Sequence, residues 1–471
     1  MVKTNSNCNK KLNFQEKELL LLRNAVDIAE KKTGMKIKQS NNIDAIIKIL
    51  EKFLRRKKVV CYGGTAINNI LPLEEQFYNK DIEIPDYDFY SSKAISLSKE
   101  LADIYAKEGY TDIEVRSGVH TGTYKVFVNF IPIADITQMD STLFKVIYDQ
   151  SIRKDGISYC PPDYLRMNMY NELSRPDGDV SRWEKVYKRL VLLNKHYPFV
   201  ANYKCSEIDF LKDFTENNQI SDSLHNIVKD VMINEGCVFI GGYAVSLYGR
   251  YMPKNKKVQL EKVVDFDVLS LDPKAVAYII KEKLQNNGFK YIDITKKQSV
   301  GDDVISTHYE LSVNGDIICY IYEPYGCYSY NEITLDNKII KIATIETILL
   351  FTLAFIYSDR PYYDHEHLMC MAQYLINVQD KNRLEQKGLL KRFNTNCYGN
   401  EKTIIEIRSK KAEKYEELKN KKETPEYNKY FLKYIPKQIK RKTTKKKPQL
   451  NIKPGNPTRK NIIKNVFKNF F

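Results

Sequence analysis

Apolar residues near the start of the chain repeat with a helical period. Residues 42–57 carry apolar side chains at i, i+3, i+4 and i+7 behind the polar pair Asn41 and Asn42, which predicts an amphipathic helix. Its basic last turn, Arg55 to Lys58, suits a helix C-terminus, with an RNA-binding patch as the alternative interpretation. A further helix is predicted over residues 14–32. Residues 1–58 are therefore expected to form an N-terminal helical segment.

A short apolar run follows and ends in two glycines. The run Val59 to Tyr62 predicts a strand, and a helix is predicted from Thr65 to Leu71, directly after Gly63-Gly64. Glycines at such a junction let the backbone approach a ligand and leave N–H groups free at the helix N-terminus. This arrangement is typical of a phosphate site, although a Gly-Gly pair more often serves only the turn.

Three aspartates come next in strand-like surroundings. Asp86 and Asp88 alternate with aromatic residues, so a strand would place both carboxylates on one face. Clustered carboxylates are costly unless a cation neutralises them, and hard divalent ions prefer oxygen ligands. Asp135 is a lone acid in the apolar strand predicted at 131–137, where an unpaired carboxylate is expensive to bury. We expect it to be a third metal ligand or a base; the alternative is a capping role at the strand end.

The same motifs occur twice in the chain. Gly241-Gly242 follows a second apolar run, and Asp265-Phe266-Asp267 begins 24 positions later (241 to 265), against 23 positions in the first copy (63 to 86). Matched spacing of two motifs indicates an internal duplication. The competing acids in the first copy, Asp81 and Glu83, have no counterpart in the second copy and are rejected for that reason.

The second copy lacks parts of the first. Tyr243 occupies the position of Thr65. A count of six residues from the Val-Asn pair before each last strand aligns Asp135 with Tyr320, while a looser register offers Glu323. We therefore expect the second copy to be degenerate, with a structural or RNA-supporting role.

Length, charge and cysteine usage limit the class of protein. A chain of 471 residues is expected to form two or three domains. The net charge of +16 predicts a polyanionic partner, and residues 431–471 contain 13 Lys or Arg and no Asp or Glu, so a flexible basic tail is expected there. The nine scattered cysteines predict reduced thiols in a cytosolic-type compartment, and no apolar stretch predicts a membrane span or a signal peptide. His365 and His367 are expected at a polar helix start rather than in a metal site.

Together, Gly63-Gly64-Thr65, Asp86-x-Asp88 and Asp135 resemble the motif of the DNA polymerase β-type nucleotidyltransferase superfamily. With the tandem degenerate copy, roughly residues 40–380 resemble the poly(A) polymerase catalytic subunit of poxviruses and giant DNA viruses. The resemblance implies an α/β (α+β) fold with two tandem nucleotidyltransferase-type domains, each a mixed β-sheet flanked by helices. The expected domains are 1–58, 59–200 (catalytic), 201–380 (degenerate) and 381–471 (charged helix and Lys-rich tail).

The resemblance also implies roles for particular residues. Asp86 and Asp88 would bind two Mg²⁺ (or Mn²⁺) ions, Asp135 would hold the ion that activates an RNA 3′-hydroxyl, and Gly63, Gly64 and Thr65 would hold the triphosphate of ATP. The basic candidates for contact with the triphosphate are Lys145, Arg153, Lys154, Arg182 and Lys185, which the sequence does not rank, and of these we name Lys154 as the expected nucleotide contact. The expected RNA contacts lie in the tail and are Lys440, Arg441, Lys442, Lys445, Lys446 and Lys447.

The implied function is template-independent addition of poly(A) from ATP to RNA 3′ ends, in the host cytoplasm or the virion of a large DNA virus. No membrane partner is expected, and the resemblance suggests a homodimer. Other interpretations stay open at this point: a CCA-adding or oligoadenylate-type enzyme, or a non-catalytic RNA-binding scaffold. A small-molecule nucleotidyltransferase is disfavoured by the basic tail.

Overall fold

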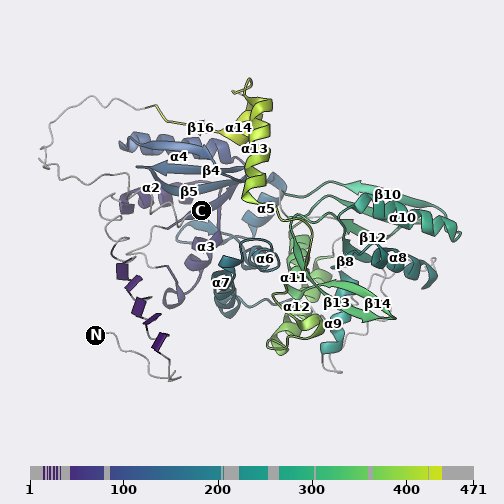
Figure 1. The fold of residues 1–471 in the computed structure, drawn as a ribbon. Helices are drawn as coiled ribbons and strands as arrows, with labels where there is room; N and C mark the ends of the chain where they lie inside the picture. The colour runs from purple at the N-terminus through teal and green to yellow at the C-terminus, as the bar shows by residue number, and fades with distance from the viewer. Residues whose placement is uncertain are drawn as a thin grey trace, which may run out of the picture. The chain divides into compact units, whose positions relative to one another are not determined.

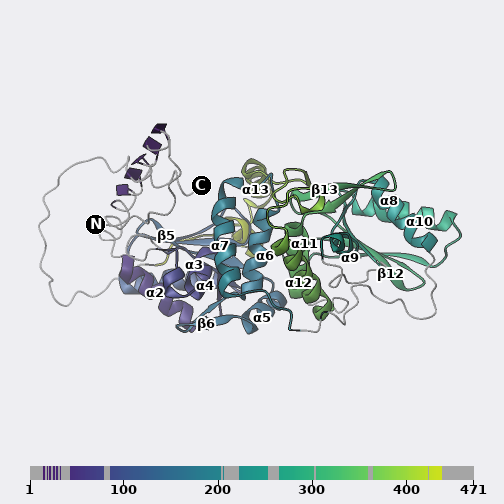
Figure 2. The same ribbon diagram turned by 90° about the horizontal axis from the view of Figure 1, so that it is seen from below.

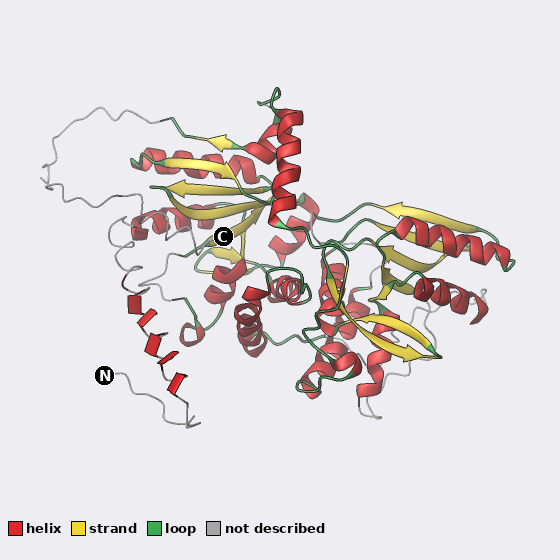
Figure 3. Cartoon of the chain, viewed as in Figure 1, coloured by secondary structure: helices red, strands yellow, loops and turns green. Residues whose placement is uncertain are grey.

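Two mixed β-sheets flanked by helices make up the fold, seen in a computed structural model of the chain (Figures 1 and 3). The structure describes residues 43–78, 85–202, 222–252, 265–301, 304–358, 364–422 and 424–437, together with Cys205 and scattered helical positions between 14 and 32. The predicted α/β class is confirmed, because each sheet has eight strands and contains both parallel and antiparallel pairs.

The first sheet has the strand order β16-β3-β4-β5-β2-β1-β7-β6. The elements up to its last helix are α2 (Ile43–Arg56), β1 (Val60–Tyr62), α3 (Gly63–Ile70), β2 (Tyr87–Ser91), α4 (Ala94–Glu108), β3 (Ile113–Ser117), β4 (Thr123–Val128), β5 (Ile131–Gln138), α5 (Ser141–Asp149), β6 (Ile152–Lys154), β7 (Ile157–Tyr159), α6 (Pro162–Leu173) and α7 (Trp183–His196).

The second sheet has the strand order β10-β11-β12-β9-β8-β14-β13-β15. The elements from its first helix onward are α8 (Asp222–Asn234), β8 (Val238–Phe239), α9 (Gly242–Tyr248), β9 (Phe266–Leu269), α10 (Pro273–Asn286), β10 (Ile292–Lys297), β11 (His308–Val313), β12 (Asp316–Tyr322), β13 (Tyr328–Leu335), β14 (Lys338–Ala343), α11 (Ile345–Tyr357), α12 (His365–Lys381), β15 (Cys397–Tyr398), α13 (Ile404–Leu418), α14 (Pro425–Phe431) and β16 (Lys433–Tyr434).

Strand order supports the internal duplication. The series β3-β4-β5-β2-β1-β7-β6 of the first sheet corresponds strand for strand to β10-β11-β12-β9-β8-β14-β13 of the second. The directions agree as well: β2–β5 and β9–β12 are parallel, as are β1–β7 and β8–β14, while the other matched pairs are antiparallel. A common topology with common strand directions is the expected result of duplicating one folding unit.

Helix predictions are confirmed where the apolar period is clear. The helix predicted at 42–57 is α2, whose buried residues are those at the predicted spacing. The helix α4 ends at Gly109, which has the left-handed conformation, φ 99°. The helix expected from Thr65 is α3, but it begins two residues earlier, at Gly63. Asp364 caps α12 by accepting from the N–H groups of Glu366 and His367, so the His-x-His segment is a helix start.

The C-terminal segment contributes a strand to each sheet, which the sequence did not predict. The strand β15 pairs with β13, and β16 pairs with β3, so residues 381–437 complete the edges of both sheets. The predicted domain boundaries remain a prediction. The chain divides into two units, Met1–Lys437 and Gln438–Phe471. The second unit, which contains the basic tail, lies outside the described residues.

Helices α6 and α11 pack against each other, as Figure 2 shows. They follow the corresponding strands β7 and β14, so equivalent helices of the two copies meet here. Almost all of α11 is buried, which explains its continuous apolar sequence. Among the described helices, none is long and apolar enough to span a membrane.

The expectation that all cysteines are reduced is wrong for four of them. Disulfides join Cys205 to Cys370 and Cys327 to Cys397, across 165 and 70 residues of sequence. Such partners meet only through tertiary structure, and their wide spacing hid them from a search for Cys-x-x-Cys pairs. Four further cysteines in the described residues are free and buried.

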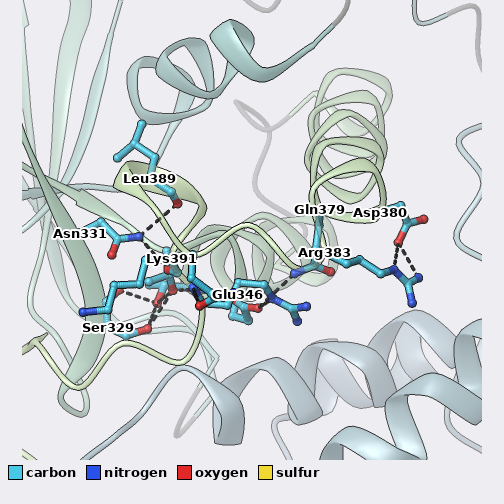
Figure 4. A network of polar contacts seen from close by, with 12 residues as sticks. Ser329, Asn331, Glu346, Gln379, Asp380, Arg383, Leu389 and Lys391 are labelled. Atoms are coloured by element: carbon cyan, nitrogen blue, oxygen red, sulfur yellow. Dashed lines mark hydrogen bonds and ion pairs between the residues drawn. The ribbon is translucent and has the colours of Figure 1, made fainter.

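A buried ion pair connects α11 to the segment that follows α12 (Figure 4). The Arg392 Nε donates to Glu346 Oε1 at 2.6 Å, and Gln379 Nε2 donates to the same oxygen at 3.1 Å. Both charged side chains are buried, whereas the nearby pair of Arg383 and Asp380 is half exposed.

Replacing Arg392 by leucine should therefore cost about 3–5 kcal/mol of unfolding free energy, because the Glu346 carboxylate would stay buried without its cation. The matched control is Arg383→Leu, which removes an exposed ion pair and should cost less than about 1 kcal/mol. Urea unfolding of both variants measures the difference. Equal costs would mean that the buried pair contributes no more than the exposed one.

Candidate active site

One face of the first sheet carries a row of polar side chains. The strand register places Tyr62 beside Asp88, Asp88 beside Asp135, and Asp135 beside Lys125, across β1, β2, β5 and β4. All four are partly buried, while their neighbours along each strand are fully buried. Since directly opposite residues point to the same face, the four side chains line one surface.

The Gly-Gly turn lies against this row. Gly63 has φ +71°, and a Cβ atom at this position would come within 2.8 Å of Asp88 Oδ2. Glycine is therefore required both by the backbone conformation and by the approach of the carboxylate. Asp86 is held beside the turn, because the Thr65 hydroxyl donates to its carbonyl oxygen. The first glycine thus serves the carboxylate site as well as the predicted phosphate site.

Burial and the neighbouring carboxylates raise the pKa values of Asp86 and Asp88. Desolvation and the charges of Asp86 and Asp135 hold the pKa of Asp88 well above its usual range. Desolvation and Asp135 also raise the pKa of Asp86. The cations that oppose these shifts are Lys125, whose ammonium donates to Asp135, together with Lys185 near Asp86 and Arg182 near Asp88.

This donor set fits a hard divalent cation, since oxygen ligands are available and added positive charge would relieve the repulsion. The three aspartates do not converge as closely as a compact ligand cluster. In the described part of the chain, the potential ligand atoms that lie within 4.8 Å of one another belong to Asp177, Cys327 and Cys397. The two cysteines of this cluster form a disulfide. That cluster therefore offers no thiolate ligands.

The helix α7 supplies Arg189, a positive charge that the sequence did not single out. Arg189 donates from Nη2 to the Tyr78 hydroxyl at 2.7 Å and lies 5.0 Å from the Phe77 ring centre. A Cβ on Gly64 would come within 2.8 Å of both guanidinium nitrogens, so Arg189 lies at the N-terminus of α3. Lys185 is one turn earlier on α7 and thus shares its face. No motif marks Arg189; only the packing of α7 beside α3 identifies it.

Other predicted contacts lie elsewhere. Lys154 donates to the carbonyl oxygens of Asn69 at 2.6 Å and Leu71 at 3.2 Å, at the end of α3 opposite to Gly63. The structure does not bring it together with the aspartates. The competing acids Asp81 and Glu83 lie outside the described residues, as do the tail residues from Lys440 to Lys447.

The second copy has the same strand arrangement as the first, but different side chains line the corresponding face of its sheet. Tyr320 pairs with Asp267 as Asp135 pairs with Asp88, so the alignment of Tyr320 with Asp135 is confirmed. Glu310 lies opposite Tyr320, where the first copy has Lys125. The charge pattern of the first copy is therefore lost.

Aromatic side chains fill the corresponding surface of the second copy. Tyr320 and Tyr322 are buried, and the ring centre of His308 lies 4.6 Å from that of Tyr322. On the opposite face of the sheet, Tyr243, at the position of Thr65, packs edge-on against Phe239 and Phe266. A Cβ on Gly241 would lie 1.9 Å from Asp267 Oδ2, which shows how closely this turn is packed. The open polar surface belongs to the first copy.

A family comparison agrees with these motifs. Residues 48–179 match the model of the protein family described as Poly(A) polymerase catalytic subunit. This segment begins within α2 and ends after α6, so it contains the strands β1 to β7 and the three aspartates. The resemblance to poly(A) polymerase catalytic subunits is thereby confirmed.

Curated relatives carry similar descriptions. The chain is 27% identical over 239 residues to the putative poly(A) polymerase catalytic subunit of Acanthamoeba polyphaga mimivirus, covering 48% of this chain and 39% of the relative. It is 29% identical over 162 residues to the putative poly(A) polymerase catalytic subunit of African swine fever virus (isolate Pig/Kenya/KEN-50/1950), covering 33% and 34%. The chain thus spans well under half the length of the curated relatives it matches.

The fold itself matches a solved structure. The crystal structure of the Megavirus polyadenylate synthase aligns with a TM-score of 0.73, over 92% of this chain and 88% of that chain, at 18% identity. The chain therefore shares that fold across both copies.

Replacing Asp88 by asparagine should stabilise the metal-free protein. A carboxyl group whose pKa is raised by folding destabilises the folded state while it is ionised, and this cost disappears as the pH falls through the raised pKa. In EDTA we expect Asp88→Asn to raise the unfolding free energy by about 1 kcal/mol at pH 8, with the gain shrinking towards pH 4.

Denaturant unfolding across this pH range is the measurement. Asp293→Asn, at an exposed position of β10, is the matched control and should change stability by less than about 0.5 kcal/mol. If Asp88→Asn were destabilising at every pH, favourable contacts rather than repulsion would dominate at Asp88.

Proposed function

We propose that this protein is a template-independent polynucleotide adenylyltransferase that adds poly(A) from ATP to RNA 3′ ends. The observation that carries this proposal is the register of β2 and β5, which puts Asp88 next to Asp135 beside the Gly63-Gly64 turn. Carboxylates facing a phosphate-binding turn are the arrangement that nucleotidyl transfer requires. The match of residues 48–179 to poly(A) polymerase catalytic subunits supports adenylate addition.

Asp86, Asp88 and Asp135 are the ligands in this proposal. Two bound Mg²⁺ or Mn²⁺ ions would lower the pKa of the attacking hydroxyl and stabilise the leaving pyrophosphate oxygens. Asp135 lies one strand farther from the Gly-Gly turn than Asp88, and we therefore assign it to the acceptor side. Lys125 donates to Asp135 and thereby fixes the orientation of that carboxylate.

The triphosphate side is built by α3 and α7. The N-terminus of α3 offers N–H groups at Gly63 and Gly64, and a helix N-terminus favours anions. Arg189 lies directly over Gly64, with Lys185 on the same face of α7. A guanidinium here can bind two phosphate oxygens at once, which orients the triphosphate in line with the acceptor hydroxyl.

Asp88→Ala should reduce nucleotide addition a thousandfold or more. Losing a metal ligand removes several kcal/mol of transition-state stabilisation, and about 1.4 kcal/mol corresponds to a factor of ten in rate. The matched control is the double variant Asp265→Ala with Asp267→Ala, which alters the same motif in the second copy and should keep near-normal turnover. An RNA primer incubated with each of the four nucleoside triphosphates in turn gives the readout.

The product pattern decides between functions. Long extension with ATP alone supports poly(A) synthesis, whereas dependence on CTP would indicate a CCA-adding enzyme and short 2′–5′ products an oligoadenylate-type enzyme. If the second-copy variant were as inactive as Asp88→Ala, both copies would have to contribute to catalysis. If the unaltered protein incorporated no nucleotide, the remaining interpretation would be a non-catalytic RNA-binding scaffold.

The basic tail is proposed to hold product RNA. Residues 438–471 contain eleven Lys or Arg and no Asp or Glu. Their removal spares β16 and should weaken RNA binding and shorten products, while single-nucleotide addition to a saturating primer persists. The fall of log K with log[salt] should also become shallower, by about 0.7 for each single-strand phosphate that the tail no longer neutralises.

A charge variant separates charge from length in this test. Changing Lys440, Arg441, Lys442, Lys445, Lys446 and Lys447 to glutamine keeps the tail and should reproduce most of the decrease in salt dependence. Binding isotherms from 50 to 300 mM salt provide the slopes. Slopes unchanged from the intact protein in both variants would exclude the tail from RNA binding.

A further inference from the structure

Three hydroxyl groups form a hydrogen-bonded chain beside the carboxylates. The Tyr62 hydroxyl and the Thr137 Oγ1 lie 2.9 Å apart, and the Oγ1 atoms of Thr123 and Thr137 lie 3.1 Å apart. The residues come from β1, β5 and β4, and all three are partly buried on the polar face. We call Tyr62, Thr123 and Thr137 the hydroxyl chain.

The hydroxyl chain has a donor to spare. Each hydroxyl carries one proton, and the two bonds within the chain use two of the three protons. One O–H group and several lone pairs thus remain for a polar group that enters from the open face.

The hydroxyl chain lies near Asp135, the carboxylate assigned to the acceptor side. Thr137 follows Asp135 by two residues on β5 and therefore lies on the same face, roughly 7 Å further along the strand. Thr123 lies on β4, three strands from β1 and its Gly-Gly turn. The hydroxyl groups thus lie near the strand that carries Asp135, the carboxylate assigned to the acceptor hydroxyl, although the backbone of Tyr62 directly precedes the Gly63-Gly64 turn.

We propose that the hydroxyl chain binds the terminal ribose of the acceptor and recognises its 2′-hydroxyl, so that RNA 3′ ends are selected over DNA 3′ ends. This inference rests on the proposed function. A 2′-hydroxyl both donates and accepts, and it is the group that distinguishes the two nucleic acids at one nucleotide. A chain with a spare donor and free lone pairs is complementary to such a group.

The second copy provides an internal comparison. The positions of Tyr62, Thr123 and Thr137 correspond there to Ile240, His308 and Tyr322, from the alignment of the glycines and of the strand registers. Ile240 has no hydroxyl, and His308 and Tyr322 are fully buried against each other. The open hydroxyl chain therefore accompanies the copy that has all three carboxylates.

A purely structural role is the competing explanation. The Tyr62 ring stacks on Tyr90 with 3.9 Å between ring centres, and the bond to Thr137 could simply fix that stack. A structural role would lower activity equally on every acceptor. Recognition of the ribose predicts a loss confined to acceptors that carry the 2′-hydroxyl, so the two explanations differ in measurable terms.

The experiment compares two primers that differ only at the last nucleotide, one ending in ribose and one in 2′-deoxyribose. Single-nucleotide kcat/KM is measured for the full-length protein and for Thr137→Val, Thr123→Val and Tyr62→Phe. We expect the unaltered protein to prefer the ribose end about tenfold or more, and Thr137→Val to reduce this preference about tenfold while kcat/KM on the deoxy primer stays constant.

The matched control is Thr295→Val, at an exposed strand position of the second sheet, which should keep the preference of the unaltered protein. Equal use of both primers by the unaltered protein, or an equal loss on both primers in the variants, would overturn the inference. Failure to extend either primer would instead overturn the proposed function. In that case the affinities of the protein for the two primers are measured at equilibrium. Tighter binding of the ribose primer would support the ribose-binding role of the hydroxyl chain, and equal affinities would reject it.

Discussion

The candidate site depends on one constraint, the parallel register of β2 and β5 that holds Asp88 beside Asp135. Two carboxylates on neighbouring strands cannot separate, because the sheet fixes their backbone positions. Desolvation and the charges of Asp86 and Asp135 raise the pKa of Asp88, and a bound cation would relieve this cost. The glycine turn adds to the constraint, since Gly63 lets the Asp88 carboxylate approach where any side chain would collide.

The same fold occurs twice in the chain with opposite surfaces. Both copies have matching strand order and direction, so the backbone frame is common to both. In the first copy the polar row keeps part of its surface exposed, while in the second copy Tyr320, Tyr322 and His308 are fully buried on the equivalent face. Aromatic burial stabilises a sheet but removes the space that a substrate needs. The second copy thus contributes packing, above all through α11 against α6.

Groups from distant parts of the chain complete the arrangement. Arg189 reaches Gly64 from α7, more than a hundred residues away, and β16 covers the edge of the first sheet at β3. An unpaired edge strand would expose backbone groups, so the short C-terminal strand protects this edge. The buried contact between Arg392 and Glu346 likewise ties a loop after α12 to the core helix α11.

The sequence by itself determined the local features: the amphipathic α2, the two Gly-Gly turns, the duplicated Asp-x-Asp motifs and the alignment of Asp135 with Tyr320. These follow from short-range periodicity and spacing, which a linear chain displays directly. Only the tertiary structure decided which distant groups meet. It directed Lys154 to the far end of α3, placed Arg189 over Gly64, paired Cys205 with Cys370, and joined Tyr62, Thr123 and Thr137 from three strands. Such contacts arise from strand order and helix packing, which no local pattern encodes.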